Sequence, residues 1–192
     1  MAGKVLILKG SPREKGNSAA LADRLAAGAT DAGLGVECLN LASLDIRPCD
    51  GCDLCKQRGD QGEYCVIDDD MQALYPKLLA ANALVLASPI YWFTYSAQLK
   101  LCIDRWYGLW NNRNDFLRGK PVGIILTYGD DDLYLSGGIN AIHTLESMFR
   151  FLEAPIRGMV YGTAMDPGDV LKNPGLMQAA YNLGRKLAEP TE

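Results

Sequence analysis

The chain has 192 residues, of which 48% are hydrophobic and 22% charged, and its formal net charge is −4. This composition is typical of one globular domain spanning 1–192, and the acidic balance excludes the basic surface of a nucleic-acid-binding protein. The sequence has neither a signal peptide nor a run of ~18 apolar residues, so we expect a cytoplasmic protein with no membrane partner.

Five short apolar runs predict five β-strands, at 5–8, 36–41, 83–87, 122–126 and 156–161. Helical spacing of apolar residues predicts five helices, at 19–32, 71–79, 99–110, 141–152 and 176–187. Pro76 is expected to kink the second helix or to delay its start. Runs that are apolar on both faces are typical of parallel strands covered by helices, so the pattern predicts an α/β fold with an open, doubly wound sheet. Such sheets bind ligands at the carboxyl ends of their strands, which makes the loops after the first, third and fourth strands the candidate site.

Small polar residues fill the first of these loops, KGSPREKGNS at 9–18. Helix amino termini carry unpaired N–H groups and partial positive charge, so they bind phosphate. Further donors suited to a phosphate dianion come from Ser11, Arg13, Asn17 and Ser18. The loop matches neither the G-x-G-x-x-G dinucleotide fingerprint nor the P-loop, which argues against a nucleoside triphosphate. The alternative is that Asn17 only caps the helix and the rest is a solvated turn.

Four aromatic residues and a proline follow the third strand, in SPIYWFTYS at 88–96. Exposed aromatic rings in a ligand-binding loop are unfavourable unless something covers them, and a flat conjugated ring would do so. A subunit interface is the other interpretation, because residues 91–95 and 106–110 can meet a partner chain. The two roles are compatible.

The segments GSPREKGNS and SPIYWFTYSAQLKLCIDR, with a cysteine stretch that ends in CVIDDDM, resemble the flavodoxin-like NAD(P)H-dependent FMN reductase superfamily, near its iron–sulfur flavoprotein branch. The resemblance implies a flavodoxin-like five-stranded parallel sheet in the order 2-1-3-4-5, FMN as cofactor, and a homodimer or homotetramer. It also implies the FMN-binding residues: Ser11, Arg13, Asn17 and Ser18 at the phosphate, Pro89, Ile90, Tyr91, Trp92 and Phe93 beside the isoalloxazine ring, and Tyr128 and Gly129 completing the ring pocket.

The implied activity is electron transfer from NAD(P)H through FMN to a small acceptor, such as a flavin, a quinone, a nitro or azo compound, or a metal ion. The flavin supplies the chemistry, so no catalytic side chain is expected, and the single histidine, His143, is interpreted as structural or exposed. The alternatives are a non-catalytic carrier, in which FMN and a cluster exchange electrons with protein partners, and a cofactor-free binding module that kept only the fold.

Four of the six cysteines fall within an insertion at about residues 48–66. Their spacing is Cys49-x2-Cys52-x2-Cys55-x9-Cys65. Cytoplasmic thiols are reduced, so a metal or redox site is a better interpretation than a disulfide framework. Three close thiolates and a distant fourth are the pattern of a [4Fe-4S] cluster, although the last interval is longer than in the iron–sulfur flavoproteins. The alternatives are unligated thiols or an adventitious disulfide, a zinc ion, and a C-x-x-C redox pair. Cys38 and Cys102 are expected in the core.

Overall fold

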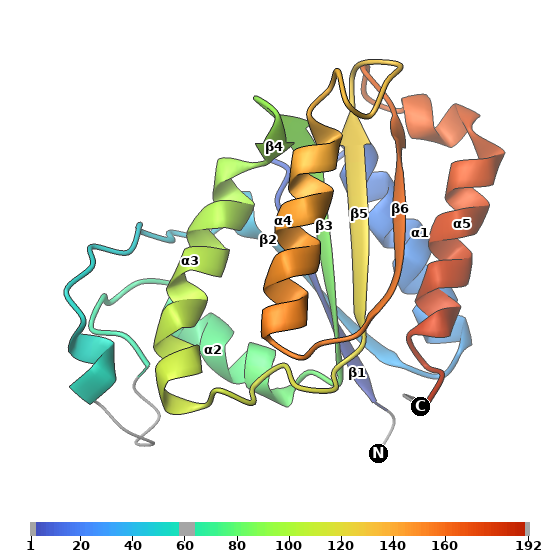
Figure 1. Ribbon diagram of the computed structural model, residues 1–192. Coiled ribbons are helices and arrows are strands. Elements are labelled where there is room, and N and C mark those ends of the chain that lie inside the picture. The colour runs from blue at the N-terminus through green and yellow to red at the C-terminus, as the bar shows by residue number, and fades with distance from the viewer. Residues whose placement is uncertain (1–2, 58–63, 191–192) are drawn as a thin grey trace.

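The computed structural model describes residues 3–57 and 64–190, and a central β-sheet carries helices on both faces (Figure 1). In chain order the elements are β1 (Lys4–Lys9), α1 (Asn17–Asp31), β2 (Gly35–Asn40), η1 (Leu41–Ser43), η2 (Leu54–Gln57), α2 (Met71–Ala80), β3 (Ala83–Tyr91), β4 (Thr94–Tyr95), α3 (Ala97–Asn112), β5 (Val122–Tyr128), α4 (Gly138–Phe151), β6 (Ile156–Thr163), η3 (Asp169–Lys172) and α5 (Pro174–Lys186). The parallel strands lie in the order β2-β1-β3-β5-β6. Since β5 and β6 are the fourth and fifth parallel strands along the chain, the predicted order 2-1-3-4-5 is confirmed.

The short strand β4 is an addition that the sequence did not predict. It pairs antiparallel with the end of β3, and the pair Tyr91 and Thr94 closes a two-residue hairpin. Trp92 and Phe93 form its tip with φ values of 44° and 68°. Positive φ at both central residues is the conformation of a type I′ turn, for which Asn-Gly is the usual signal. The aromatic tip gave no such signal, so the hairpin was expected as loop.

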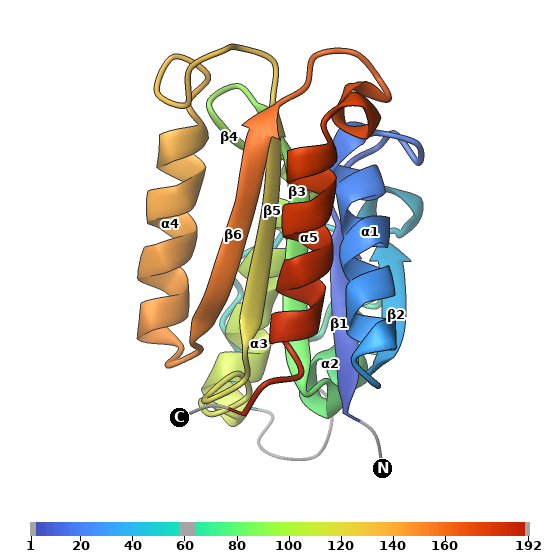
Figure 2. The same cartoon turned by 90° about the vertical axis from the view of Figure 1, so that its right-hand side faces the viewer.

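Alternate residues of the central strands pack into two apolar cores, one on each face of the sheet. Leu6 and Leu8 of β1 pack with α2, α3 and α4, whereas Val5 and Ile7 pack with α1 and α5. Figure 2 shows α1 and α5 side by side on their face. Glycines allow this close approach, because a Cβ on Gly28 or on Gly184 would lie 2.0 Å from a backbone carbonyl oxygen of the other helix.

One local prediction was wrong. Cys38 is exposed, not buried, because β2 is an edge strand of the sheet. Of the two effects expected of Pro76, the delayed start is excluded: α2 begins at Met71, whose N–H donates to Asp69 Oδ1 at 3.1 Å, and Pro76 lies inside the helix. Two others are confirmed: Cys102 is fully buried, and His143 is exposed on α4.

Strand register aligns the loops that follow the strands. Pro89 of β3 lies beside Thr127 of β5, and Thr127 lies beside Gly162 of β6. Lys9 at the end of β1 lies beside Ala87 of β3. The loops after β1, β3, β5 and β6 therefore leave the same edge of the sheet, at the top of Figure 1. Within the described ranges, no helix combines the length and the apolar character needed to cross a membrane.

Candidate active site

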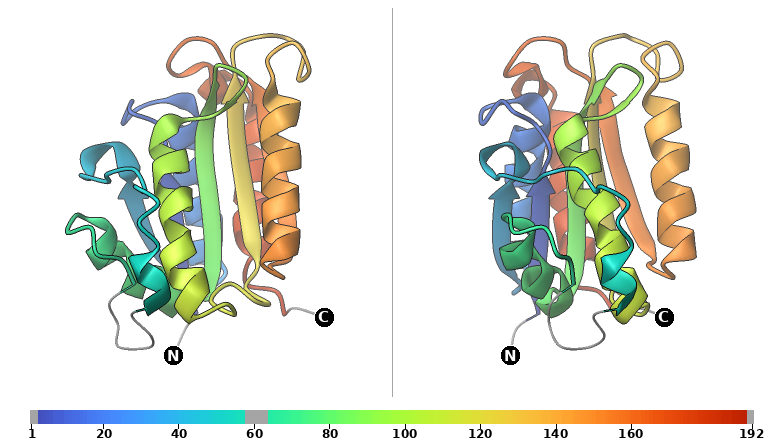
Figure 3. Two further views of the ribbon diagram at one scale, coloured as in Figure 1. Left: turned by 60° about the vertical axis from the view of Figure 1, so that its left-hand side comes forward. Right: turned by 90° about the vertical axis from the view of Figure 1, so that its left-hand side faces the viewer.

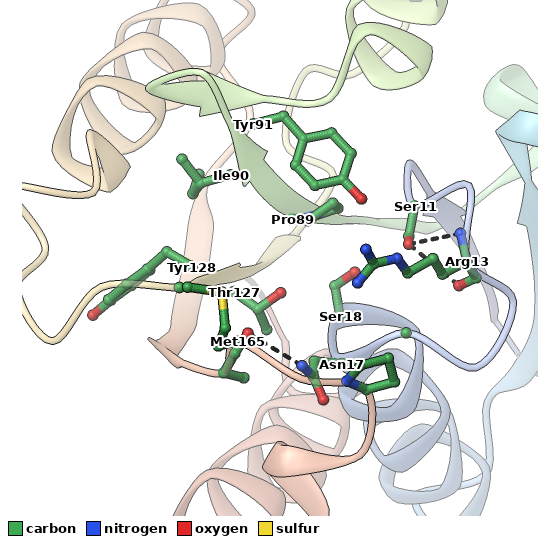
Figure 4. A pocket seen from close by; sticks show the side chains of 14 residues that line it. Ser11, Arg13, Asn17, Ser18, Pro89, Ile90, Tyr91, Thr127, Tyr128 and Met165 are labelled. Atoms are coloured by element: carbon green, nitrogen blue, oxygen red, sulfur yellow. Dashed lines mark hydrogen bonds between the residues drawn. The ribbon is translucent and has the colours of Figure 1, made fainter.

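A cavity of about 240 Å³ opens at this edge, lined by the loops after β1, β3, β5 and β6 (Figure 4). All the residues predicted to bind the cofactor line it except two, Trp92 and Phe93. Sequence segments more than 100 residues apart thus meet at one point, with Arg13 at one end of the cavity and Tyr128 toward the other. The β6–α5 loop contributes Met165 and Pro167, which the sequence analysis did not single out.

The polar end of the cavity is built by the β1–α1 loop. Ser11 is almost fully buried, and its Oγ accepts the Arg13 N–H at 3.1 Å, while the Gly16 N–H donates to Arg13 O at 3.0 Å. Gly16 occupies the N-cap position of α1, where no side chain caps the helix. The first helical hydrogen bond runs from the Ala20 N–H to Gly16 O, so the N–H groups of the first turn are available to an anion.

Asn17 has a role that neither sequence interpretation included. Its Nδ2 donates to Ala164 O at 3.2 Å and to Asp166 O at 2.8 Å, and its Oδ1 accepts the Gly168 N–H at 3.0 Å. The side chain therefore does not cap α1 but holds the β6–α5 loop against it. Its amide group is occupied by the protein, and the part of Asn17 left for a phosphate is its backbone N–H.

The apolar end of the cavity is a wall formed by the end of β3. Pro89, Ile90 and Tyr91 line the cavity, and Tyr91 is 41% exposed. The hairpin then turns the chain away, so that Trp92 is 91% exposed and contributes nothing to the lining. Of the five residues predicted to lie beside the ring, three therefore line the cavity, whereas the side chains of Trp92 and Phe93 are exposed and do not line it.

A hydrogen-bonded serine pair connects the wall to the polar loop. The buried Ser88 Oγ accepts the Ser96 N–H at 2.9 Å, and the Ser96 Oγ donates to Gly10 O at 2.7 Å. Only glycine fits at position 10, because a Cβ there would lie 2.6 Å from the Ser96 Oγ. Sequence reasoning missed this network, although a serine directly before a predicted helix is a usual N-cap signal, and Ser96 is the N-cap of α3.

Tyr128 and Gly129 line the cavity from the end of β5. Burial raises the pKa of the Tyr128 phenol above its ordinary value, and the nearby Tyr161 adds to the effect, so the hydroxyl stays protonated at neutral pH. Beyond them three consecutive aspartates, 130–132, begin a turn, in which Asp132 Oδ1 accepts the backbone N–H groups of Tyr134 and Leu135.

A second cavity, of about 170 Å³, lies beside α3 and is lined by all four clustered cysteines. The segment that carries the first three runs across the outer side of α3, and η2 packs against this helix (Figure 3). Asn111 Nδ2 lies 3.6 Å from Cys55 Sγ, and Asn112 Nδ2 donates to Cys55 O at 3.3 Å. The four thiols are free. Of the predicted insertion 48–66, residues 58–63 lie outside the described residues.

The donors of this cavity do not converge on one point. Within the described ranges, no group of three or more His, Cys, Asp or Glu side chains is arranged to hold a single metal ion. A zinc ion needs four ligands at about 2.0–2.3 Å from one centre, whereas a [4Fe-4S] cluster binds one thiolate at each of its four irons. The four free thiols that line this cavity match a [4Fe-4S] cluster in number, one thiolate for each iron.

A buried ion pair, which the sequence analysis did not detect, ties the carboxyl end of the cysteine segment to α3. The side chains of Arg105 and Asp69 are 1% and 0% exposed, and Arg105 Nη1 donates to Asp69 Oδ2 at 2.5 Å. Burial alone would lower the pKa of the Arg105 guanidinium, but the hydrogen bonds to Asp69 outweigh burial and raise that pKa above its ordinary value. Both groups are therefore charged at neutral pH.

Comparison with known proteins agrees with this geometry. A model of the NADPH-dependent FMN reductase family matches residues 3–164. An iron–sulfur flavoprotein of Methanocaldococcus jannaschii is 32% identical over 192 residues, which cover 97% of this chain and 96% of that protein. An iron–sulfur flavoprotein of Methanosarcina thermophila is 29% identical over 195 residues, which cover 98% of this chain and 95% of that protein.

Among solved structures, an NAD(P)H:quinone oxidoreductase from Methanothermobacter marburgensis is similar with a TM-score of 0.74 at 21% identity, and 100% of both chains is covered. That likeness supports the flavodoxin-like fold. The family match spans most of the chain, from the start of β1 to the end of β6. The chain therefore belongs to the NADPH-dependent FMN reductase family, as a flavodoxin-like oxidoreductase that uses FMN and is related to the iron–sulfur flavoproteins.

Proposed function

We propose that the protein oxidises NAD(P)H and passes the electrons through FMN to a small acceptor, such as a flavin, a quinone, a nitro or azo compound, or a metal ion. The proposal rests on one observation: the same cavity has the open amino terminus of α1 at one end and the wall formed by β3 at the other. A mononucleotide has the same two parts, a charged phosphate and a flat apolar ring.

The residues of the cavity fit FMN by their chemistry. Ser11 and Ser18 offer hydroxyls, Arg13 offers a guanidinium, and the first turn of α1 offers backbone N–H groups, which together match a phosphate dianion. Pro89, Ile90 and Tyr91 offer the apolar wall for the ring. FMN supplies the hydride and electron chemistry when it is bound.

The protein groups at the cavity serve to bind and orient. Among the described residues that line it there is no carboxylate and no histidine, so these side chains offer no general base of the kind that proton-transfer enzymes use. Tyr91 is partly exposed, so solvent reaches part of the wall. We therefore assign the residues the task of holding two rings in contact, which is a proximity effect.

We also propose a homodimer or homotetramer. Several large apolar side chains around the cavity are exposed, among them Trp92 at 91%, Tyr134 at 70% and Met165 at 67%. Apolar side chains in such numbers at one edge of a protein mark a contact surface. Size-exclusion chromatography with light scattering tests the assembly.

A second candidate function is an electron carrier in which a [4Fe-4S] cluster accompanies FMN. The specific observation is that Cys49, Cys52, Cys55 and Cys65 line one cavity with free thiols, and two relatives are named iron–sulfur flavoproteins. The donor set of four thiolates fits this group. A bound cluster supplies one-electron chemistry, and the four thiolates would hold it.

One set of measurements separates the two functions. Anaerobically purified protein is loaded with FMN, and its ultraviolet–visible spectrum, iron and acid-labile sulfide are determined. Oxidation of NADH and NADPH is then followed with menadione, ferricyanide or free flavin as acceptor. Turnover with flavin-loaded protein supports the oxidoreductase, whereas a fully loaded protein without turnover supports the carrier. A colourless protein that does not take up FMN contradicts both.

A further inference from the structure

A cation, Arg105, lies at the wall of the cysteine cavity. Arg105 of α3 lines this cavity together with the four cysteines and with Asp50, Asp53 and Asp104. Lys56 pairs with Asp53 and Lys100 pairs with Asp104. Among the described residues that line the cavity, Arg105 is the one that carries a positive charge.

The guanidinium of Arg105 is held rigidly from one side. Nη1 donates to Arg47 O at 2.9 Å and to Asp69 Oδ2 at 2.5 Å, and Nη2 donates to Asp69 Oδ1 at 3.2 Å. Asp69 also accepts the Arg47 N–H at 2.9 Å and the Met71 N–H at 3.1 Å. Asp69 does not line the cavity, so the ion pair presents its positive end to the cysteines.

One donor of this buried cation has no acceptor. Arg105 Nε is buried, and in the described part of the chain it has no hydrogen-bond partner. Buried polar groups are almost always paired, and an unpaired donor on a charged group is unfavourable. In the described ranges two other buried side-chain nitrogens lack partners, Trp106 Nε1 and Arg157 Nε, but neither residue lines this cavity.

We propose that Arg105 is a positioning residue of the cysteine cavity, whose Nε–H donates a hydrogen bond to a sulfur of the group held there and whose charge offsets that of the thiolates. The inference rests on the second proposed function, in which that group is a [4Fe-4S] cluster. Four thiolates around a cluster bring net negative charge into a partly buried space, where a nearby cation stabilises the more negative, reduced state.

A purely structural role accounts for only part of this arrangement. The hydrogen bonds of Nη1 and Nη2 tie the two ends of the cysteine segment, at Arg47 and Asp69, to α3. They leave Nε unused and give no reason for a cation at the wall of a cavity lined by thiols. Structural support and charge balance therefore predict different results when Arg105 is replaced.

The test compares the wild-type chain with Arg105→Met, Arg105→Lys and Lys56→Met after anaerobic reconstitution with iron, sulfide and FMN. Lys56→Met is the matched control, because it removes one positive charge from an exposed side chain of η2, where solvent screens it. The readouts are iron and sulfide per chain, FMN content as a test of folding, and the reduction potential of the cluster from an EPR-monitored titration.

We expect Arg105→Met to raise the ratio of oxidised to reduced cluster at least tenfold at a fixed potential. This change corresponds to a fall of about 59 mV in the reduction potential of a one-electron couple. The reduction potential of Arg105→Lys should fall less, because lysine keeps the charge but lacks Nε. The reduction potential of Lys56→Met should match that of the wild type. A loaded Arg105→Met protein with the wild-type potential would overturn the proposal.

A measurement on the wild-type protein guards against a variant that does not fold. With ¹⁵N-labelled arginine, pulsed EPR of the reduced cluster should detect a coupling to one arginine nitrogen, and the lack of any coupling would refute the hydrogen bond. A wild-type chain that binds FMN and oxidises NAD(P)H but takes up no iron would overturn both the cluster and the role of Arg105. The proposed oxidoreductase would stand in that case.

Discussion

Asn17 is the residue whose replacement tests the architecture of the site most directly. Asn17→Ala removes two hydrogen bonds that Nδ2 donates to the β6–α5 loop and two that Oδ1 accepts from it, the latter from Gly168 at 3.0 Å and Val170 at 3.4 Å. Each bond contributes about 0.5–1.5 kcal/mol net, and the last is long. Because water can reach part of the loop, we expect the free energy of unfolding to fall by about 2–4 kcal/mol.

Urea denaturation followed by circular dichroism measures this change on FMN-free and FMN-loaded protein. The loop also brings Met165 and Pro167 to the cavity, so the affinity for FMN, measured by quenching of flavin fluorescence, should fall about tenfold or more, or about 1.4 kcal/mol. Asn140→Ala is the control, because its exposed amide makes one bond, of 3.3 Å, to Phe93 O. The control should lose less than about 0.5 kcal/mol.

Asn17→Asp distinguishes this account from a simple helix cap. A carboxylate at position 17 would place an oxygen against the two carbonyl oxygens that Nδ2 now contacts, so we expect it to destabilise the protein at least as much as alanine. Aspartate is as good as asparagine in a capping position and favourable in the first turn of a helix. An Asn17→Asp protein as stable as the wild type would refute the reasoning.

Three further predictions follow from other parts of the fold. Arg13→Ala combined with Ser18→Ala should weaken FMN binding by roughly 2–4 kcal/mol, or about 30- to 1000-fold, in the same fluorescence titration; unchanged affinity would mean that the phosphate binds elsewhere. Gly28→Ala should destabilise the fold by more than ~2 kcal/mol in urea, because its Cβ would lie 2.0 Å from a carbonyl oxygen of α5, and wild-type stability would contradict that packing. Hydrogen bonds from two lysines lower the pKa of Glu37 below its ordinary 4.5, so its stabilisation is present above that pH and is lost as the pH falls through the folded value. The stability difference between the wild type and Glu37→Gln should therefore shrink in acid, and a difference that does not depend on pH would contradict the assignment.

The parallel sheet could be predicted from the sequence because burial leaves a clear pattern, whereas its strand order came from the family resemblance. Strands such as 83–87 and 122–126 are apolar on both faces, and such runs occur where helices cover both sides. Cys38 shows the limit of that reasoning. Part of its strand is apolar, as in a central strand. Its place at the edge of the sheet, however, depends on how the other strands pair, and that place exposes the thiol.

The site was predictable where a residue type has one common use at a given position. Ser11 and Arg13 before a helix indicate an anion site, and both line the cavity. Asn17, Trp92 and Arg105 were not predictable, because their roles depend on partners distant in the sequence or on backbone geometry. Asn17 bonds to residues about 150 positions away, Trp92 has positive φ, and Arg105 pairs with a carboxylate 36 positions before it.

The chain of hydrogen bonds from Ser88 through Ser96 to Gly10 has a consequence for ligand capture. It ties the ring wall, the start of α3 and the anion-binding loop into one rigid unit. A mononucleotide that enters this pocket meets surfaces that already have their final shape, so its binding does not have to order a loose segment. Preorganisation of this kind raises affinity by reducing the entropy lost on association.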